Sequence, residues 1–224
     1  MKLSIVATLY QSAPYIREFY QRARKVAYEL VEDNYEIVLV NDGSPDNSLD
    51  LAIELAEMDH HVIVVDLSRN FGHHKAMMAG LSYAKGEQIF LIDSDLEEEP
   101  EWLLTFSAKM DQESCDVVYG AQISRKGNRL ERWSGQWFYR LFKRLTGLAL
   151  PDNVVTARLM TRRYVSALTQ HQEREVFMAG LWYITGFKQS PITVRKHDNS
   201  ETTYTLRRKL SLLALFPKSL NLSL

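Results

Sequence analysis

Two aspartates separated by one residue, Asp93 and Asp95, follow an apolar run in the stretch LIDSDLEEEP. Carboxylates spaced in this way, where a strand opens into a loop, can converge on one hard cation, and Mg²⁺ and Mn²⁺ prefer such oxygen ligands. A cation held there would neutralise charge on a diphosphate leaving group. The pair therefore predicts a metal and diphosphate site.

The same stretch has a second interpretation, because acidic side chains also stabilise the amino terminus of a helix. Glu98, Glu99 and Glu101 directly precede or begin a predicted helix, EWLLTFSAKM. We expect these three carboxylates to act only as a solvated helix cap, so the metal interpretation depends on the two aspartates.

Two further groups of polar residues could do chemistry. Asp42, in NDGSPD, could accept hydrogen bonds from a nucleobase, or it could cap a helix or form an Asx turn. His73 and His74 precede a helical stretch and lack a third ligand at a suitable spacing. We expect solvated or capping histidines there rather than metal ligands.

The elements that must position these residues alternate regularly through the first half of the chain. Continuous apolar runs predict strands, which are KLSIVATL, YEIVLVN, HVIVVDL and QIFLID. Helical patterns lie between them: Pro14 to about Glu32, DNSLDLAIELAEM, and HHKAMMAGLSYAKG closed by Gly86. Runs without polar alternation indicate strands buried on both faces of a parallel sheet. The sequence therefore predicts an α/β protein with a doubly wound, Rossmann-like, mostly parallel sheet and helices on both faces.

Ligands of open α/β sheets bind beyond the carboxyl ends of the strands. The predicted strands end in polar residues, which are Thr8 and Tyr10, Asn41 and Asp42, Ser68 to Asn70, and Asp93 to Asp95. The dinucleotide motif G-x-G-x-x-G and the P-loop motif are both absent from the sequence, which weakens those two nucleotide-binding interpretations.

The second half of the chain is less regular. CDVVYGAQI predicts a strand, TARLMTRRYVSAL a strand and then a helix, and REVFMAGLWYITG a helix. The segment NRLERWSGQWFYRLFKRLTG is basic, aromatic and amphipathic. It could lie on an anionic membrane surface, or it could be a core helix with one solvated face.

Composition narrows the class of protein. The chain has 224 residues and a net charge of −1, so it is long enough for one large domain and has no basic excess that would favour nucleic acid. One cysteine provides no disulfide framework, which fits a cytoplasmic protein. We interpret MKLSIVATLY as a first strand rather than a signal peptide, and no uncharged apolar run approaches the ~20 residues of a membrane span.

Several segments, in this order, resemble family 2 glycosyltransferases of the GT-A fold: SIVATLYQ, VLVNDGSPDNS, VVDLSRNFGHHKAMMAGLSYAKG and FLIDSDLEEEPE. The branch they resemble most transfers sugars to polyprenyl phosphate, and the likeness covers roughly residues 3 to 210. It implies a GT-A domain over residues 1–210 and a short basic-apolar tail over 211–224, where that branch generally continues into membrane helices.

The resemblance also implies roles for single residues. Thr8 and Tyr10 would lie beside the nucleobase, Asp42 would hold it, and Asn70, Lys75 and Ser94 would lie near the nucleotide. Asp93 and Asp95 would bind the diphosphate and the metal, and Glu97 stands where this branch often carries a metal-binding Gln. Arg158 matches a family Arg and is a catalytic candidate with the two aspartates, and Arg132 is our candidate for binding the acceptor phosphate.

The implied activity is that of an inverting glycosyltransferase. It would move a sugar from a nucleotide-sugar, with UDP expected, to polyprenyl (undecaprenyl) phosphate with the help of Mg²⁺ or Mn²⁺. We expect it to lie peripherally at the cytoplasmic face of the inner membrane. The alternatives are a family 2 enzyme that extends a lipopolysaccharide or capsule saccharide, and a non-catalytic remnant that binds nucleotide or membrane.

Two departures from the family pattern bear on the acceptor. Thr156 stands where many relatives have an Asp, and Ser200 to Tyr204 lacks the Lys of the usual Gly-x-Ser-Lys-Tyr. A phosphate monoester, with a second pKa of ~6, is already largely anionic at neutral pH, whereas a sugar hydroxyl would need a base. The missing Asp therefore favours a lipid-phosphate acceptor, while Glu173 and Glu175 stay possible bases.

Overall fold

The computed structural model describes residues 1–122, 153–171 and 178–197, and these residues belong to one compact unit. Several predicted features lie outside the described residues: Arg132 with the basic aromatic segment, Glu173 and Glu175, the Ser200 to Tyr204 stretch, and the tail 211–224.

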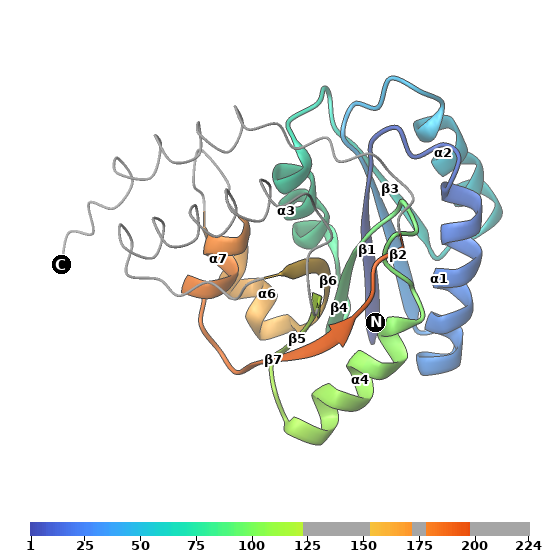
Figure 1. The fold of residues 1–224 in the computed structure, drawn as a ribbon. Helices are drawn as coiled ribbons and strands as arrows, with labels where there is room; N and C mark the ends of the chain where they lie inside the picture. The colour runs from blue at the N-terminus through green and yellow to red at the C-terminus, as the bar shows by residue number, and fades with distance from the viewer. Residues whose placement is uncertain (123–152, 172–177, 198–224) are drawn as a thin grey trace, which may run out of the picture. The chain divides into compact units, whose positions relative to one another are not determined.

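Seven strands of the described residues form one sheet, in the order β3-β2-β1-β4-β6-β5-β7 (Figure 1). They are β1 (Leu3–Leu9), β2 (Tyr35–Asn41), β3 (Val62–Asp66), β4 (Gln88–Asp93), β5 (Val117–Gln122), β6 (Val154–Thr161) and β7 (Gln189–Val194). Strands β1 to β4 are parallel, and β7 is parallel to β5, whereas β6 runs antiparallel to both of its neighbours. The predicted mostly parallel α/β sheet is confirmed.

Helices cover both faces of this sheet (Figure 1). One face packs against α1 (Ile16–Val31), α2 (Ser48–Met58) and α4 (Trp102–Glu113), and the other against α3 (His73–Tyr83), α6 (Arg162–Leu168) and α7 (Met178–Ile184). Each helix contributes an apolar stripe at helical spacing, as in α1, where Ile16, Phe19, Tyr20, Ala23, Val26 and Ala27 are buried. The core is therefore two apolar layers, one on each side of the sheet.

Two local expectations were wrong. Helical spacing in α2 predicts an apolar stripe of Leu49, Ala52, Ile53 and Ala56. Ile53 is however 43% exposed and Leu55 is buried instead, because α2 contacts mainly the edge strand β3 and buries only a narrow face. Helix α3 ends at Tyr83 rather than at Gly86. Gly86 instead lies where a Cβ would come within 2.5 Å of the Ser4 backbone nitrogen, so the close approach to β1 requires glycine.

Strand β7 was not predicted, and its sequence explains why. Pro191 interrupts the apolar pattern, and proline normally argues against a strand because it cannot donate a ladder hydrogen bond. The structure accommodates Pro191 because β7 is the edge strand beside β5. The residues after β7 are important for the site described below.

The strand order reverses between β1 and β4. From β1 the chain moves outward to β2 and β3, and then returns through α3 to β4 on the other side of β1. Thr8 of β1 consequently pairs in register with Asp93 of β4, while Leu9 pairs with Asn41 of β2. Such a reversal is the usual ligand-binding position of open α/β sheets.

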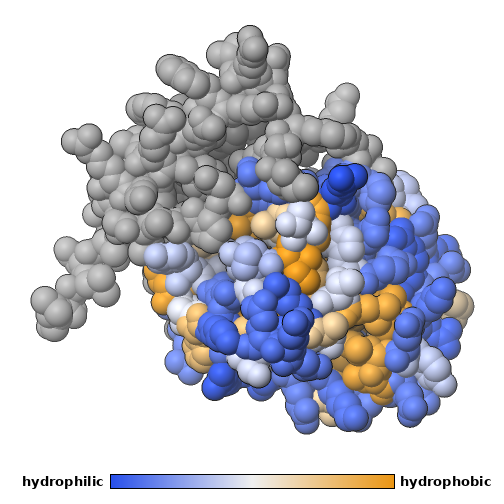
Figure 2. All heavy atoms as spheres, turned by 60° about the horizontal axis from the view of Figure 1, so that its bottom comes forward, coloured by the Kyte–Doolittle hydropathy of each residue, from blue (hydrophilic) through white to orange (hydrophobic). Residues whose placement is uncertain are grey.

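Figure 2 turns the bottom of Figure 1, where β1 begins, toward the viewer. Hydrophilic side chains dominate this face, and hydrophobic ones form small separate patches. No helix in the described part of the chain is long and apolar enough to cross a membrane.

Candidate functional site

Asp93 is the last residue of β4 and lies between two basic side chains. His73 Nε2 is 3.3 Å from Asp93 Oδ1, and Lys196 Nζ is 3.9 Å from Oδ2. The histidine contact does not have hydrogen-bond geometry, so Oδ1 is a buried atom without a hydrogen-bond partner among the described residues. Burial opposes ionisation, but the charges of His73 and Lys196 outweigh it and lower the pKa of Asp93 to about 2.

His73 connects three elements of the site. It begins α3, its Nδ1 is 3.1 Å from Thr8 Oγ1 at the end of β1, and its Nε2 faces Asp93 at the end of β4. Burial works against protonation, yet the carboxylate of Asp93 raises the pKa of His73. The His73 side chain is 46% exposed, as expected of a solvated histidine, but it also contacts Thr8 and Asp93, because the strand order brings its helix beside β4.

The loop after β4 turns back on itself at Leu96, whose backbone is left-handed with φ 59°. Within the loop, Asp95 Oδ1 accepts a hydrogen bond from the Glu97 backbone nitrogen at 3.0 Å. Burial, and then the charge of Asp93, raise the pKa of Asp95. The negative charge that raises the pKa of Asp95 also makes this loop a favourable place for a cation.

Glu98 is fully buried, which contradicts the expected solvated helix cap. Its Oε1 accepts a hydrogen bond from the Thr156 backbone nitrogen at 3.0 Å and forms an ion pair with Lys196 Nζ, also at 3.0 Å. Its Oε2 is buried without a partner among the described residues. Burial, together with the charge of Asp93, raises the pKa of Glu98 to about 7. The carboxylate of Glu98 thus belongs to the interior of the site. It lies beside Thr156, which stands where many relatives have an Asp.

The other two expected cap residues also connect distant elements. Glu99 Oε1 is 2.5 Å from His197 Nε2, and Glu101 Oε2 is 2.6 Å from Arg22 Nη2 of α1. Helix α4 receives no side-chain cap hydrogen bond at its amino terminus. The acidic run is therefore held by basic side chains from other parts of the chain.

Lys196, just after β7, was missed by the sequence analysis. Its Nζ lies 3.0 Å from Glu98 Oε1, 3.4 Å from Glu97 Oε2 and 3.9 Å from Asp93 Oδ2. Burial disfavours its charge, but Glu98 and Asp93 together raise the pKa of Lys196. A lysine after an unpredicted edge strand gave no local signal. The contact depends on the end of β7 meeting, in space, the acidic loop, which we define as residues 94–101 between β4 and α4.

Asp42 is 2% exposed and orders a neighbouring loop. Its Oδ1 accepts a hydrogen bond from the Phe71 backbone nitrogen at 2.7 Å, and its Oδ2 accepts one from Gly72 at 3.0 Å. Gly43, with φ +58°, must be glycine here because a Cβ would come within 2.5 Å of the Asn70 backbone nitrogen. The structure therefore brings the predicted residues Asp42 and Asn70 together.

The remaining predicted residues at this edge differ in exposure. Ser94 is buried, and its hydroxyl donates to the Thr8 carbonyl oxygen at 2.8 Å, which ties the ends of β1 and β4 together. Thr8 is 8% exposed, whereas Tyr10 is 50% exposed. Lys75 lies in the first turn of α3, where its backbone nitrogen donates to the Gly72 carbonyl.

Arg158 is fully buried in β6, with 1% of its surface exposed. Its guanidinium donates to the backbone carbonyls of Thr156 at 3.2 Å and Val155 at 3.1 Å, and it stacks on the ring of Trp182. Burial lowers the pKa of Arg158 to about 9, while the nearby carboxylates, Glu98 among them, oppose that shift. Arg158 is thus a buried positive charge beside the acidic loop.

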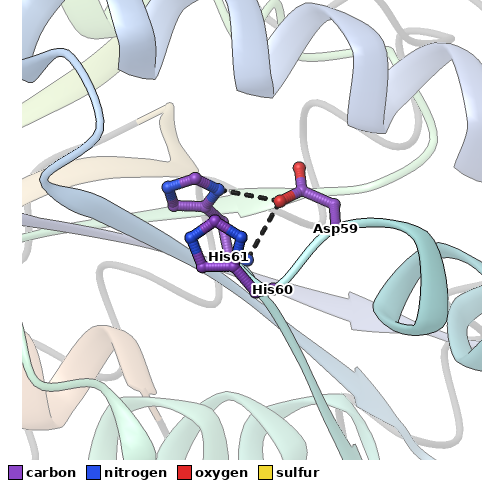
Figure 3. A group of neighbouring side chains, drawn as sticks. All are labelled: Asp59, His60 and His61. Carbon is purple, nitrogen blue, oxygen red and sulfur yellow. Dashed lines mark hydrogen bonds and ion pairs between the residues drawn. The ribbon is translucent and has the colours of Figure 1, made fainter.

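Figure 3 shows a second group of residues that could bind a metal, Asp59, His60 and His61, which lie just before β3. Ligand atoms of Asp59, His60 and His61 come within 4.8 Å of one another, and in the described residues no other such group of three occurs. Both oxygens of Asp59 are already engaged, Oδ1 by His61 Nδ1 at 2.7 Å and Oδ2 by the Tyr20 hydroxyl at 2.7 Å. Because these residues precede β3, they anchor the amino-terminal edge and cannot reach a ligand at Asp93.

Comparisons with known proteins place this chain in a family. The family model described as Glycosyl transferase family 2 matches residues 4–169. A protein of Mycobacterium tuberculosis (strain CDC 1551 / Oshkosh) is 50% identical over 213 residues, which cover 95% of this chain and 62% of that protein. The chain therefore spans less than two thirds of that relative's length.

Solved structures share the fold at low sequence identity. S. aureus TarS 1-349 in complex with UDP-GlcNAc superposes with a TM-score of 0.59 at 20% identity, over 92% of this chain and 62% of that one. Glucosyl-3-phosphoglycerate synthase from Mycobacterium tuberculosis, in complex with Mn²⁺, UDP-glucose and phosphoglyceric acid, gives a TM-score of 0.57 at 18% identity, over 89% and 73% of the chains.

Proposed function

Because the chain belongs to glycosyltransferase family 2, we propose that it transfers a sugar from a UDP-sugar bound where β1 and β4 end. One observation carries this proposal: Asp93, in register with Thr8 at the strand-order reversal, has a buried carboxylate oxygen without a hydrogen-bond partner among the described residues. Two proteins with the same fold are known in complex with UDP-sugars, which supports this choice of donor.

The end of β4 and the loop after it fit a divalent cation. Asp93, Asp95 and Glu97 would hold Mg²⁺ or Mn²⁺, because the loop offers only oxygen ligands and Asp93 Oδ1 is unsatisfied. When bound, the ion would stabilise the charge of the departing nucleoside diphosphate. The structural relative that binds UDP-glucose also binds Mn²⁺, which supports the same assignment.

Residues around the acidic loop have positioning roles in this proposal. Asp42 orders the loop that carries Asn70, and Tyr10 offers an exposed aromatic ring beside the proposed nucleobase position. Ser94 keeps the ends of β1 and β4 together. Arg158 is too deeply buried to contact substrate directly, so we assign it a positioning role, in which its charge supports the acidic loop.

For the acceptor we propose polyprenyl phosphate, attacked in a single displacement that inverts the anomeric carbon. The acceptor phosphate is anionic without a base, which fits Thr156 at the position of the family Asp. Arg132 is proposed to bind that phosphate, and peripheral contact with the membrane would bring the lipid to the site. A saccharide hydroxyl is the second candidate, because Glu98 places a buried carboxylate at the Thr156 backbone.

Ligand-induced stabilisation tests the donor proposal. Thermal unfolding of wild type and Asp95→Asn is measured with UDP, GDP, CDP or ADP, each with and without Mn²⁺. We expect UDP with Mn²⁺ to stabilise wild type by about 2.7 kcal/mol at 100 times its dissociation constant, and Asp95→Asn to abolish that gain. Asp111→Asn, an exposed carboxylate on α4, is the matched control and should respond as wild type does.

If no nucleotide stabilises the protein, the proposed donor site is contradicted. If UDP stabilises it equally with and without Mn²⁺, and equally in Asp95→Asn, the proposed metal site is contradicted. Transfer from UDP-glucose and UDP-GlcNAc is then measured with undecaprenyl phosphate in vesicles and with soluble saccharides. Transfer to the saccharide alone would replace the lipid-phosphate acceptor by a hydroxyl acceptor.

A further inference from the structure

The ammonium group of Lys196 lies within the set of carboxylates assigned above to the metal. It contacts Glu97 at 3.4 Å and Asp93 at 3.9 Å, and its shortest contact, at 3.0 Å, is to Glu98. The side chain is 22% exposed, so these charges are only partly screened by water. The ammonium of Lys196 therefore already occupies a position among the carboxylates of the acidic loop.

Lys196 is held in this place by more than its side chain. The backbone nitrogen of His197 donates to the Glu97 carbonyl at 2.9 Å, and the His197 ring pairs with Glu99. The end of β7 is thereby fastened to the loop that carries Asp95. These contacts fix the backbone of Lys196 beside the carboxylates, whereas its flexible side chain can exchange one carboxylate for another.

The carboxylates are spread around this ammonium. In the part of the chain that the structure describes, Asp93, Asp95 and Glu97 do not bring three ligand atoms within 4.8 Å of one another, although Asp59, His60 and His61 do. A divalent ion that gathers these oxygens must compete with the ammonium for Asp93 and Glu97. Two cations sharing the same anions repel each other, so each lowers the affinity for the other.

We propose that Lys196 is an internal competitor of the divalent ion, so that the acidic loop binds metal tightly only together with the donor's diphosphate. This inference rests on the proposed function, because it takes Asp93 and Glu97 as metal ligands. The diphosphate changes the balance in two ways: it adds negative charge that attracts the metal, and it offers the ammonium a new anionic partner. Glu98, which is not assigned to the metal, holds Lys196 at the site throughout.

Mn²⁺ binding in the absence of nucleotide tests the competition directly. Free Mn²⁺ is measured by electron paramagnetic resonance during titration of wild type, Lys196→Met and Lys196→Arg. We expect Lys196→Met to bind Mn²⁺ alone roughly tenfold more tightly, because one competing charge is removed from the carboxylates. Lys196→Arg keeps the charge and should stay close to wild type.

The second readout is the affinity for UDP, which should change in the opposite direction to the affinity for Mn²⁺. Isothermal titration of UDP at saturating Mn²⁺ should show weaker binding to Lys196→Met than to wild type, because the diphosphate loses a cationic partner. A merely structural lysine would weaken both affinities or neither. Lys109→Met is the matched control, since it removes a lysine that pairs with Glu113 on the outside of α4 and should change neither affinity.

The outcomes separate this inference from the proposed function. If wild type binds Mn²⁺ and UDP but Lys196→Met binds Mn²⁺ equally or more weakly, the competition is overturned and the donor site stands. If no variant binds Mn²⁺ under any condition, both proposals are overturned. Lys196→Gln, which keeps a polar group beside Glu98, carries the same expectation and replaces the methionine variant if that one does not fold.

Discussion

The Asp42 side chain is engaged by the backbone of a neighbouring loop. The family resemblance implies that it holds the nucleobase, but both of its oxygens accept backbone hydrogen bonds from Phe71 and Gly72. Because the carboxylate is buried, losing it would leave two amide groups without their partner. The stability of the loop, and not only ligand affinity, should depend on this residue.

Replacing Asp42 tests that distinction. We expect Asp42→Ala to lower the free energy of unfolding by about 2 kcal/mol without any ligand, as measured by urea denaturation. Asp66→Ala is the control, since Asp66 ends the neighbouring strand β3 and is exposed, although it accepts one hydrogen bond from Asn41. This substitution should lower the free energy of unfolding clearly less. If Asp42→Ala is as stable as wild type but binds UDP more weakly, Asp42 acts only by binding the nucleobase.

At the scale of elements, the turn between α2 and β3 is held by a buried carboxylate. Asp59 accepts hydrogen bonds from the Tyr20 hydroxyl, the His61 backbone and the His61 ring, and the His61 ring stacks on Tyr35. Burial alone would raise the pKa of Asp59, but these partners outweigh it and lower the value from 3.8 to about 2. The ionised carboxylate of Asp59 therefore stabilises the turn.

This shift predicts how the stability of the protein depends on pH. A carboxyl whose pKa is lower in the folded state stabilises the fold fully above its unfolded pKa, and that contribution is lost as pH falls toward the folded pKa. We expect Asp59→Asn to be less stable than wild type at pH 6, and the difference to shrink by about 2 kcal/mol between pH 5 and pH 2.

Urea denaturation across that pH range checks the prediction. Asp111→Asn, which removes an exposed carboxylate from α4, should keep a constant difference from wild type. A difference for Asp59→Asn that stays equally constant would mean that the ionised form does not stabilise the turn.

At the scale of the whole molecule, β6 joins two parts of the sheet that differ in strand direction. It runs antiparallel between β4, which ends at Asp93, and β5, which pairs with β7. Arg158 lies in the middle of β6, opposite Leu91 on one side and Tyr119 on the other. The charge that faces the acidic loop is therefore built into the strand that holds both parts together.

Arg158 should accordingly contribute to the stability of the entire unit. We expect Arg158→Met to lower the free energy of unfolding by roughly 3 kcal/mol, because two buried carbonyls lose a charged donor and the acidic loop loses a cation. Arg158→Lys should recover little, since one ammonium cannot reproduce the planar contacts with both carbonyls and Trp182. Calorimetric and urea unfolding measure both variants.

Arg163→Met provides the contrast for this prediction. Arg163 belongs to the adjoining helix α6 and pairs with Asp116, but its side chain is 71% exposed. Its loss should have a much smaller effect than the loss of Arg158. Equal effects of the two substitutions would show that burial in β6 is not what makes Arg158 important.

Much of the fold could be predicted because its signals are local. Apolar runs bounded by polar turns indicate buried strands, and apolar residues at helical spacing indicate the helices between them. Those patterns placed β1 to β6 and their order in the chain, and the rule for open sheets directed attention to the strand ends at Thr8, Asp42 and Asp93. Strand β7 was missed because an edge strand tolerates the proline that disfavours strands elsewhere.

The sequence by itself determined the fold class, the family and the acidic pair after β4, because each depends on neighbours in the chain. Only the tertiary structure decided what surrounds that pair. His73, Glu98 and Lys196 come from α3, the acidic loop and the end of β7, and their charges act on Asp93 only through proximity in space. Electrostatic energy falls with spatial distance and not with separation along the chain, so these partners became visible only when the sheet was assembled.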